Sequence, residues 1–182
     1  MRKKILIGLG VVAALLAIFI VVVALQPSTF RVVRTAAMAA PPADVFAQVN
    51  DFHNWDAWSP WAKRDPKMKA IYEGPTEGEG AIYRWVGNDE VGEGGMTITE
   101  SRPSELILIK LEFLKPFKST CDTEFAFKPK GDETEVTWSM SGQNNFIGKM
   151  FCMFMNMDKT VGGDFEKGLS KMKAVVEAKP EQ

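Results

Sequence analysis

A stretch of 21 residues without a polar side chain, Ile5 to Leu25, constrains this chain more than any other feature. It contains no charged, amide or hydroxyl group, so a helix made from it is apolar on every face. At the rise of an α-helix it spans roughly 31 Å, which matches the hydrocarbon thickness of a bilayer. The segment is therefore predicted to be a transmembrane helix.

A cleaved signal peptide is the alternative for this segment. The apolar region of a signal peptide usually runs about 7–15 residues and ends in a small-x-small site. Here the apolar run is longer, and bulky Leu25 occupies a position where a small residue is needed. No cysteine near the end of the segment is available to accept a lipid. A retained anchor is the favoured interpretation.

The charged flanks indicate the orientation of the span. Basic residues tend to stay in the cytoplasm, and the run 2–4 before the span is entirely basic. Arg31 and Arg34 follow it, so the asymmetry is modest. We expect a single-pass protein of the cell (inner) membrane whose domain is periplasmic or extracellular. Its parts would be a cytoplasmic basic flank 1–4, the span 5–25, a linker 26–29, a domain 30–178 and a tail 179–182.

Charge and cysteine content limit the partners of the domain. Residues 26–182 carry 19 basic and 23 acidic side chains, a formal charge of −4, which argues against nucleic acid as a partner. The two cysteines, Cys121 and Cys152, are expected to be buried thiols, although their spacing does not say whether they pair. Neither belongs to a CxxC motif, so no zinc site is expected. We expect no metal and no cofactor.

The order of elements in the domain predicts an α+β fold. Phe30 to Met38 is typical of a strand, and two short helices are expected next, one opened by the prolines 41 and 42 and one over 51–61. A period of two with glycine and proline turns then predicts an antiparallel meander. Its strands are expected at 68–73, 81–86, 95–102, 105–114, 120–128 and 134–142. One face of this sheet is expected to be apolar and the other exposed to solvent.

The last element is predicted to be one long helix, from Phe146 to Ala178, that covers the apolar face of the sheet. Val161, Phe165, Leu169, Met172 and Val176 recur every three or four residues along it. The pair 162–163 is Gly-Gly, which favours a bend or a close approach to the sheet.

Several short motifs in this order resemble a known superfamily. They are Pro42-Ala43-Asp44-Val45-Phe46, the segment Asp51 to Trp61, Gly78-Glu79-Gly80 with Tyr83 and Trp85, Phe125-Ala126-Phe127, Thr134 to Trp138, and Asp164 to Leu169. The chain resembles the START-like, pollen-allergen-like helix-grip superfamily (SRPBCC), in its polyketide cyclase/dehydrase and lipid transport branch, over Phe30 to Glu177. The resemblance implies a curved antiparallel sheet wrapped around a long C-terminal helix, with a cavity between them.

Catalytic signatures are missing from the sequence. No nucleophile elbow, HExxH motif, phosphate-binding loop or dinucleotide fingerprint occurs. His53 is the one histidine and would be the natural acid or base near neutral pH, but a solvated or backbone-bonded side chain is the favoured interpretation. The sequence also contains the carboxylates of Asp51, Asp56 and Glu73, but their spacing does not place them on one face of a helix or strand. We predict no catalytic residue.

Two apolar clusters allow two interpretations each. Trp55, Trp58 and Trp61 form either a wall for an apolar ligand or the packing of a short helix on the sheet. The methionine-rich segment 146–157 is too apolar for one buried face, so it meets a cavity or a membrane, or it is packed tightly on both sides.

The implied cavity has a predicted lining of apolar and aromatic side chains. These are Trp58, Trp61, Tyr72, Tyr83, Trp85, Met96, Ile98, Leu111, Phe113, Phe125, Trp138, Met140, Phe154, Met157 and Phe165. Such a lining binds apolar molecules through contact area more than through hydrogen bonds. The sequence thus predicts a membrane-tethered, non-enzymatic binding module for a hydrophobic small molecule or lipid. The alternatives are a cyclase or dehydratase acting on a polyketide-like substrate through His53, Tyr72 or Tyr83, or an accessory interaction protein with a collapsed cavity.

Overall fold

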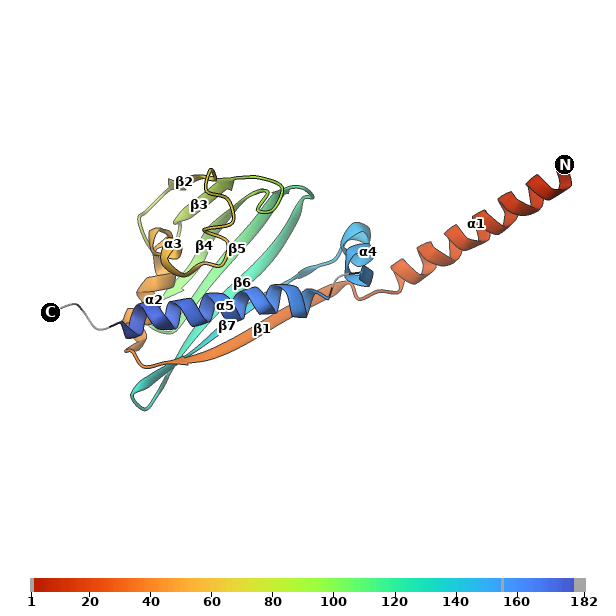
Figure 1. Cartoon of the computed structure of the whole chain (residues 1–182). Helices are drawn as coiled ribbons and strands as arrows, with labels where there is room; N and C mark the ends of the chain where they lie inside the picture. The colour runs from red at the N-terminus through yellow and green to blue at the C-terminus, as the bar shows by residue number, and fades with distance from the viewer. Residues whose placement is uncertain (1, 155, 179–182) are drawn as a thin grey trace.

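The computed structural model describes residues 2–154 and 156–178. An apolar helix, α1 (Arg2–Ala24), leads into an α+β domain and projects away from it (Figure 1). The elements of the domain follow in the order β1 (Thr29–Met38), α2 (Pro42–Asn50), the short 3₁₀ helix η1 (Phe52–Asn54), α3 (Trp55–Trp58), β2 (Lys69–Glu73), β3 (Ile82–Val86), β4 (Glu93–Arg102), β5 (Leu106–Lys115), β6 (Ser119–Lys130), β7 (Glu133–Gln143), α4 (Phe146–Phe154) and α5 (Met157–Glu177).

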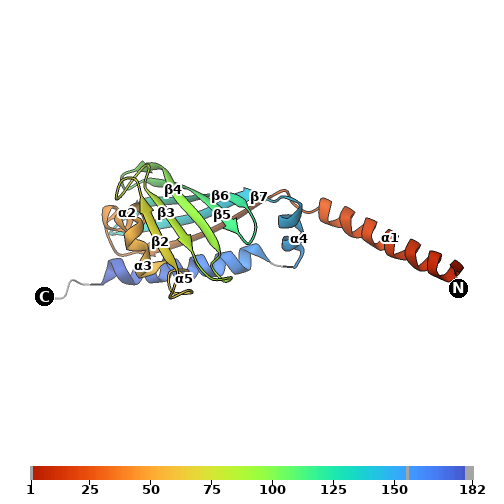
Figure 2. The same cartoon turned by 90° about the horizontal axis from the view of Figure 1, so that it is seen from above.

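The seven strands form one antiparallel sheet in the order β1-β7-β6-β5-β4-β3-β2. Every strand lies within two residues of its predicted bounds, because alternating apolar residues between turn signals define strand ends well. The register shifts twice between β4 and β5, and such bulges bend and twist a sheet. Figure 2 shows α5 lying along the inner side of this curved sheet. The predicted helix-grip fold is confirmed.

The predicted single helix 146–178 is in fact two helices, and this part of the prediction was wrong. Asn156 lies between them with extended backbone, and its side-chain Oδ1 accepts a hydrogen bond from the backbone N of Lys159 at 2.9 Å. An asparagine at this N-cap position starts a new helix. The sequence pattern did not reveal this start, because Asn156 follows a run of apolar residues. Residue 155 lies outside the described residues.

Gly162 marks a close approach between α5 and β1 and not a bend, since α5 continues through it. A Cβ at this position would collide with the guanidinium of Arg34 on β1. Arg34 in turn donates to Glu166 Oε1 at 2.6 Å and to Asp158 Oδ1 at 2.9 Å. These bonds fasten the first half of α5 along the edge strand of the sheet.

The second short helix, expected over 51–61, is shorter than predicted. It consists of η1 and one turn of α3, which ends at Trp58. Ser59 leaves the helical region with φ −58° and ψ 131°, because the residue before Pro60 disfavours the α conformation. Residues 59–68 then cross to β2 as a segment that we call the strap.

The N-terminal helix is long and apolar enough to cross a membrane over Lys4–Ala24, judged by length and composition. It ends one residue before the predicted limit, and β1 begins at Thr29, so four residues connect the two. The backbone N of Asn144 at the end of β7 donates to Ser28 O at 2.8 Å, and its side-chain Nδ2 to Pro27 O at 3.3 Å. The connection is therefore held against the end of the sheet nearest α1.

Candidate functional site

The inner face of the sheet carries nearly all of the predicted lining. Tyr83 on β3 pairs with Met96 on β4, Met96 pairs with Leu111 on β5, and each pair puts its side chains on the same face. The alternation of the strands thus gathers residues from six segments of the chain onto one apolar surface. Burial divides that surface into two regions.

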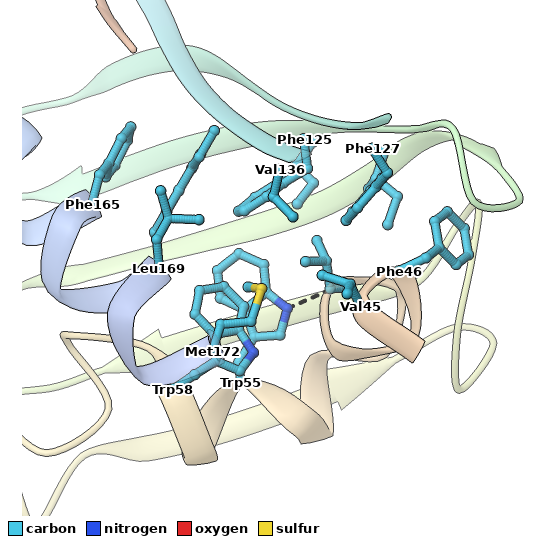
Figure 3. Close-up of a cluster of buried hydrophobic side chains, with 14 of the residues drawn as sticks. Val45, Phe46, Trp55, Trp58, Phe125, Phe127, Val136, Phe165, Leu169 and Met172 are labelled. Carbon is cyan, nitrogen blue, oxygen red and sulfur yellow. Dashed lines mark hydrogen bonds between the residues drawn. The ribbon is translucent and has the colours of Figure 1, made fainter. Parts of the chain in front are cut away.

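The first region is a solid aromatic core beneath the second half of α5. The ring of Trp138 stacks between Phe165, with centroids 3.9 Å apart, and Phe125, at 4.8 Å. Trp58 meets the same ring edge-on at 5.6 Å. Figure 3 shows Phe125, Trp58 and Phe165 converging with Leu169 and Met172 in this layer. The predicted lining residues Trp58, Trp85, Ile98, Phe125, Trp138, Met140 and Phe165 are buried.

The tryptophans of η1 and α3 belong to this core. Their indole Nε1 groups donate to the last turn of α2, from Trp55 to Val49 O at 3.1 Å and from Trp58 to Gln48 O at 3.0 Å. Both rings are thereby fixed and buried, which favours packing over a ligand wall for these two. Trp138 differs, because its buried Nε1 has no hydrogen-bond partner among the described groups.

The second region is an apolar row that remains partly exposed. Tyr83, Met96, Leu111 and Phe113 are half-buried on the inner face of β3, β4 and β5. Tyr72 continues the row on β2, with its ring centroid 5.3 Å from that of Tyr83. The row lies in the half of the sheet that is nearer to α1, on the strands farthest from β1 and α5. We call these five residues the open row.

The strap closes one side of this region. Arg64 Nη2 lies 2.7 Å from the carboxylate of Asp164 on α5, a carboxylate that is only 10 % exposed. Asp65 Oδ2 accepts the backbone N–H of Asn88 in the β3–β4 turn at 2.7 Å. A Cβ on Gly168 of α5 would lie 3.1 Å from Pro60, so the start of the strap packs directly on the helix. The strap therefore joins α5 to the far edge of the sheet, and half-buried Trp61 lies within it.

An Asp–His pair stands at the rim of the domain, next to the open row. Asp51 Oδ1 accepts from the backbone N of His53 at 2.9 Å and lies 2.7 Å from its ring Nδ1. The His53 ring stacks on Tyr72 with centroids 4.0 Å apart and borders a cleft of about 210 Å³. An aspartate on Nδ1 orients an imidazole and leaves Nε2 for a proton. Sequence reasoning missed this pair, although the Asp-x-His spacing at a helix start was a usable signal.

The two tyrosines of the chain are held in their neutral form. Burial, and then the nearby Asp56 and Asp51, raise the pKa of Tyr72. Burial, and then Tyr72 and Asp56, raise the pKa of Tyr83 to about 12. Both hydroxyls are therefore proton donors over the whole physiological range.

A second hollow of about 440 Å³ lies at the end of the domain nearest α1. Its walls come from the connection after α1, the start of β1, and α4 with the residues that follow it. Phe30, Cys152, Met153 and Met157 supply its apolar lining, and Thr29, Asn144 and Asn156 supply its polar lining. Met157 is thus the predicted lining residue found here, while the side chain of Phe154 lies outside the described residues.

The two cysteines of the chain are free thiols. Cys121 is buried, and this burial, with Asp122 second, raises the pKa of its thiol to about 11. Cys152 is half-buried, and neither cysteine forms a disulfide. In the described part of the chain, no three His, Cys, Asp or Glu side chains are placed to hold a metal ion.

Comparison with known proteins assigns the domain to a sequence family. Residues 29–177 match the family described as polyketide cyclase / dehydrase and lipid transport. No functionally curated protein matches the chain.

Solved structures show the same fold at low identity. A di-domain aromatase/cyclase, BexL of the BE-7585A biosynthetic pathway, is 17% identical with a TM-score of 0.60, covering 87% of this chain and 53% of BexL. Protein CV1439 of Chromobacterium violaceum is 17% identical with a TM-score of 0.57, covering 85% and 100%. A protein of unknown function from Staphylococcus aureus, SA2116, is 13% identical with a TM-score of 0.60, covering 82% and 94%. At these identities the likeness concerns the fold.

Proposed function

Because this chain belongs to the polyketide cyclase/dehydrase and lipid transport family, we propose that it binds a hydrophobic small molecule or lipid without transforming it, while tethered to the membrane by α1. The open row carries the proposal. Most of the rest of the inner face is buried in the core, whereas Tyr83, Met96, Leu111 and Phe113 are half-buried on one continuous surface. Apolar area of this kind favours an apolar partner by about 25 cal/mol per Å² covered.

The geometry favours binding at the open row over binding in the aromatic core. Stacked rings at 3.9 Å and 4.8 Å occupy the space beneath the second half of α5. A ligand there would have to displace buried side chains, at several kcal/mol each. The open row needs no displacement, and the strap closes one side of it. We therefore place the ligand over β3, β4 and β5, in the half of the sheet nearer to α1.

The membrane part of the proposal rests on α1. Its apolar window carries no acidic or basic residue after Lys4 and is exposed apart from Val23, so the domain does not use it as a core helix. The connection of four residues keeps the domain close to the end of α1. Such a tether raises the rate at which the site meets membrane lipids without any new contact. We propose that the basic N-terminus is cytoplasmic and the domain lies on the other side of the membrane.

Photolabelling tests the proposed site. The full chain, reconstituted in phosphatidylcholine vesicles that contain a diazirine fatty acid, is irradiated, and labelled peptides are mapped by mass spectrometry. We expect adducts on β4 and β5 in the native chain, loss of these adducts in Met96→Glu, and their retention in Thr97→Glu. Thr97 is the matched control because it is adjacent in sequence and on the opposite face of β4. Labelling of α1 alone, in all three proteins, would refute the binding proposal.

An enzyme of cyclase or dehydratase type is the second candidate, and the Asp51–His53 pair is the observation that favours it. His53 would act as base at Nε2, with Tyr72 beside it as a neutral proton donor. His53→Ala separates the two candidates, since Asp51 still caps η1 through the backbone N of residue 53. For a binding module we expect photolabelling to persist and stability to stay within about 0.5 kcal/mol. If His53→Ala abolishes the activity of the protein in the cell while folding and labelling stay intact, the enzyme hypothesis is supported.

A further inference from the structure

An exposed apolar surface is formed by α4 and the β5–β6 turn together. Phe146, Ile147 and Phe151 of α4 are 48 %, 41 % and 42 % exposed, and Phe117 of the turn is 49 % exposed. The rings of Phe117 and Phe151 lie 5.5 Å apart, so the helix and the turn share one surface. Ile147 and Phe151 are one helical turn apart and therefore point to the same side. We call these four residues the α4 patch.

The α4 patch is fixed next to the end of α1. Lys149, the one charged residue of α4, donates its Nζ to Ala24 O in the last turn of α1 at 3.0 Å. Val23 is fully buried, although the rest of the apolar helix is exposed, because α4 contacts this end of α1. Asn144 holds the connection at Pro27 and Ser28, just before α4 begins. Both views show α4 between α1 and the sheet (Figures 1 and 2).

The chemistry of the patch indicates what covers it. Large exposed apolar groups that adjoin one another mark an interaction site. Exposed apolar side chains of a helix beside a membrane span can be buried in the boundary between headgroups and acyl chains. The patch adjoins the end of a helix that is proposed to cross the bilayer, and Lys118, exposed beside Phe117, carries the charge that suits a phosphate headgroup. A lipid surface meets all of these features at once.

We propose that the α4 patch inserts into the headgroup–acyl boundary of the leaflet from which α1 emerges. The domain is then held on the bilayer by two contacts, the span and the patch, and does not hang freely from a flexible linker. This inference rests on the proposed anchoring through α1. It also brings the hollow between the start of β1 and α4 to the level of the lipids.

Depth-dependent fluorescence quenching tests the patch. The full chain with Cys152→Ser carries Phe151→Cys, labelled with bimane and reconstituted in phosphatidylcholine/phosphatidylglycerol vesicles containing 5-doxyl phosphatidylcholine. Cys121 stays unlabelled at neutral pH because it is buried and its thiol pKa is raised. The control is Asp132→Cys in the same background, at the exposed β6–β7 turn on the opposite end of the sheet. We expect at least threefold stronger quenching at position 151.

The outcomes separate the two proposals. A second variant, Phe117→Cys, guards against a local effect at 151 and is expected to behave in the same way. Equal quenching at 151, 117 and 132 in chains that resist alkaline extraction overturns the patch but leaves the anchor and the photolabelling intact. Release of the chain by alkali overturns the anchor and the patch together. Labels that are shielded from aqueous iodide but not quenched by the doxyl lipid show a protein on the patch, which also overturns the lipid assignment.

Discussion

Trp138 occupies the centre of the aromatic core with an unpaired donor. Its faces are covered by Phe125 and Phe165, and its Nε1 has no partner among the described groups. A buried donor without a partner costs about 1–3 kcal/mol of stability, whereas ring stacking and burial at the same position contribute more. The packing of the Trp138 ring therefore outweighs the cost of its unpaired N–H.

Substitutions at Trp138 should separate these two effects. Trp138→Ala is expected to lower the free energy of unfolding by about 3–5 kcal/mol, as for other buried aromatic residues. Trp138→Phe should cost less than about 1.5 kcal/mol, because the smaller ring leaves a gap but removes the unpaired N–H. Urea unfolding followed by far-ultraviolet circular dichroism measures both. A similar large loss in the two variants would mean that the indole nitrogen is paired in solution.

The tyrosines give a residue-scale test at high pH. Since the chain has only Tyr72 and Tyr83, and both pKa values are raised, no tyrosine should titrate near its ordinary pKa of about 10. The tyrosines then hold more protons in the folded than in the unfolded state between about pH 10 and 12, so their contribution to stability falls as pH rises through this window and is constant below it. Absorbance at 295 nm follows tyrosinate directly, with Tyr83→Phe as control. A midpoint near 10 in the folded chain would contradict this.

At the scale of elements, the strap depends on one partly buried ion pair. Arg64 neutralises Asp164, while Lys167 lies 3.6 Å from the same carboxylate and is mostly exposed. Removing the arginine leaves a nearly buried charge with a weaker partner, and that is costlier than losing both groups.

A double-mutant cycle tests this coupling. Arg64→Met is expected to cost about 1–2 kcal/mol, and Arg64→Met with Asp164→Asn should cost less than the sum of the two single changes by at least 0.5 kcal/mol, as for residues in contact. Thermal unfolding of the full chain in detergent measures the three variants. Additive effects would show that the ion pair does not hold the strap and that its other contacts, including those of Pro60, Trp61 and Asp65, suffice.

At the scale of the whole molecule, the proposed location of the domain rests on one helix. The basic residues 2–4 form the first turn of α1, and four residues separate the end of this helix from β1. The fold and the proposed location thus depend on separate parts of the chain, which contact each other where α4 packs on the end of α1.

Reporter fusions test the topology. Alkaline phosphatase fused after Gln182 is expected to be active, and green fluorescent protein exported unfolded by the same route should be dark. The opposite pair of results would place the domain in the cytoplasm. Deleting residues 1–25 should leave a soluble domain, because no other apolar segment of that length occurs in the sequence.

The sequence by itself determined the fold and most of its boundaries. Strand 119–130 follows from alternation, which puts Cys121, Thr123, Phe125 and Phe127 on one face, because successive side chains of a strand point to opposite faces. The family resemblance over 30–177 agrees with the match over 29–177 for the same reason, because turns and alternation persist where identity does not. These are local properties, readable without knowing any contact.

The tertiary structure decided everything that depends on distant residues. Alternation placed Trp138 and Tyr83 on the same face, but only packing against α5 buried the first and left the second half-exposed. The collision that requires Gly162 comes from Arg34, and the pair Arg64–Asp164 joins residues a hundred positions apart. The break at Asn156 was hidden because a cap is a single side chain in an apolar run. Burial and side-chain pairing depend on neighbours in space, so local sequence patterns cannot predict them.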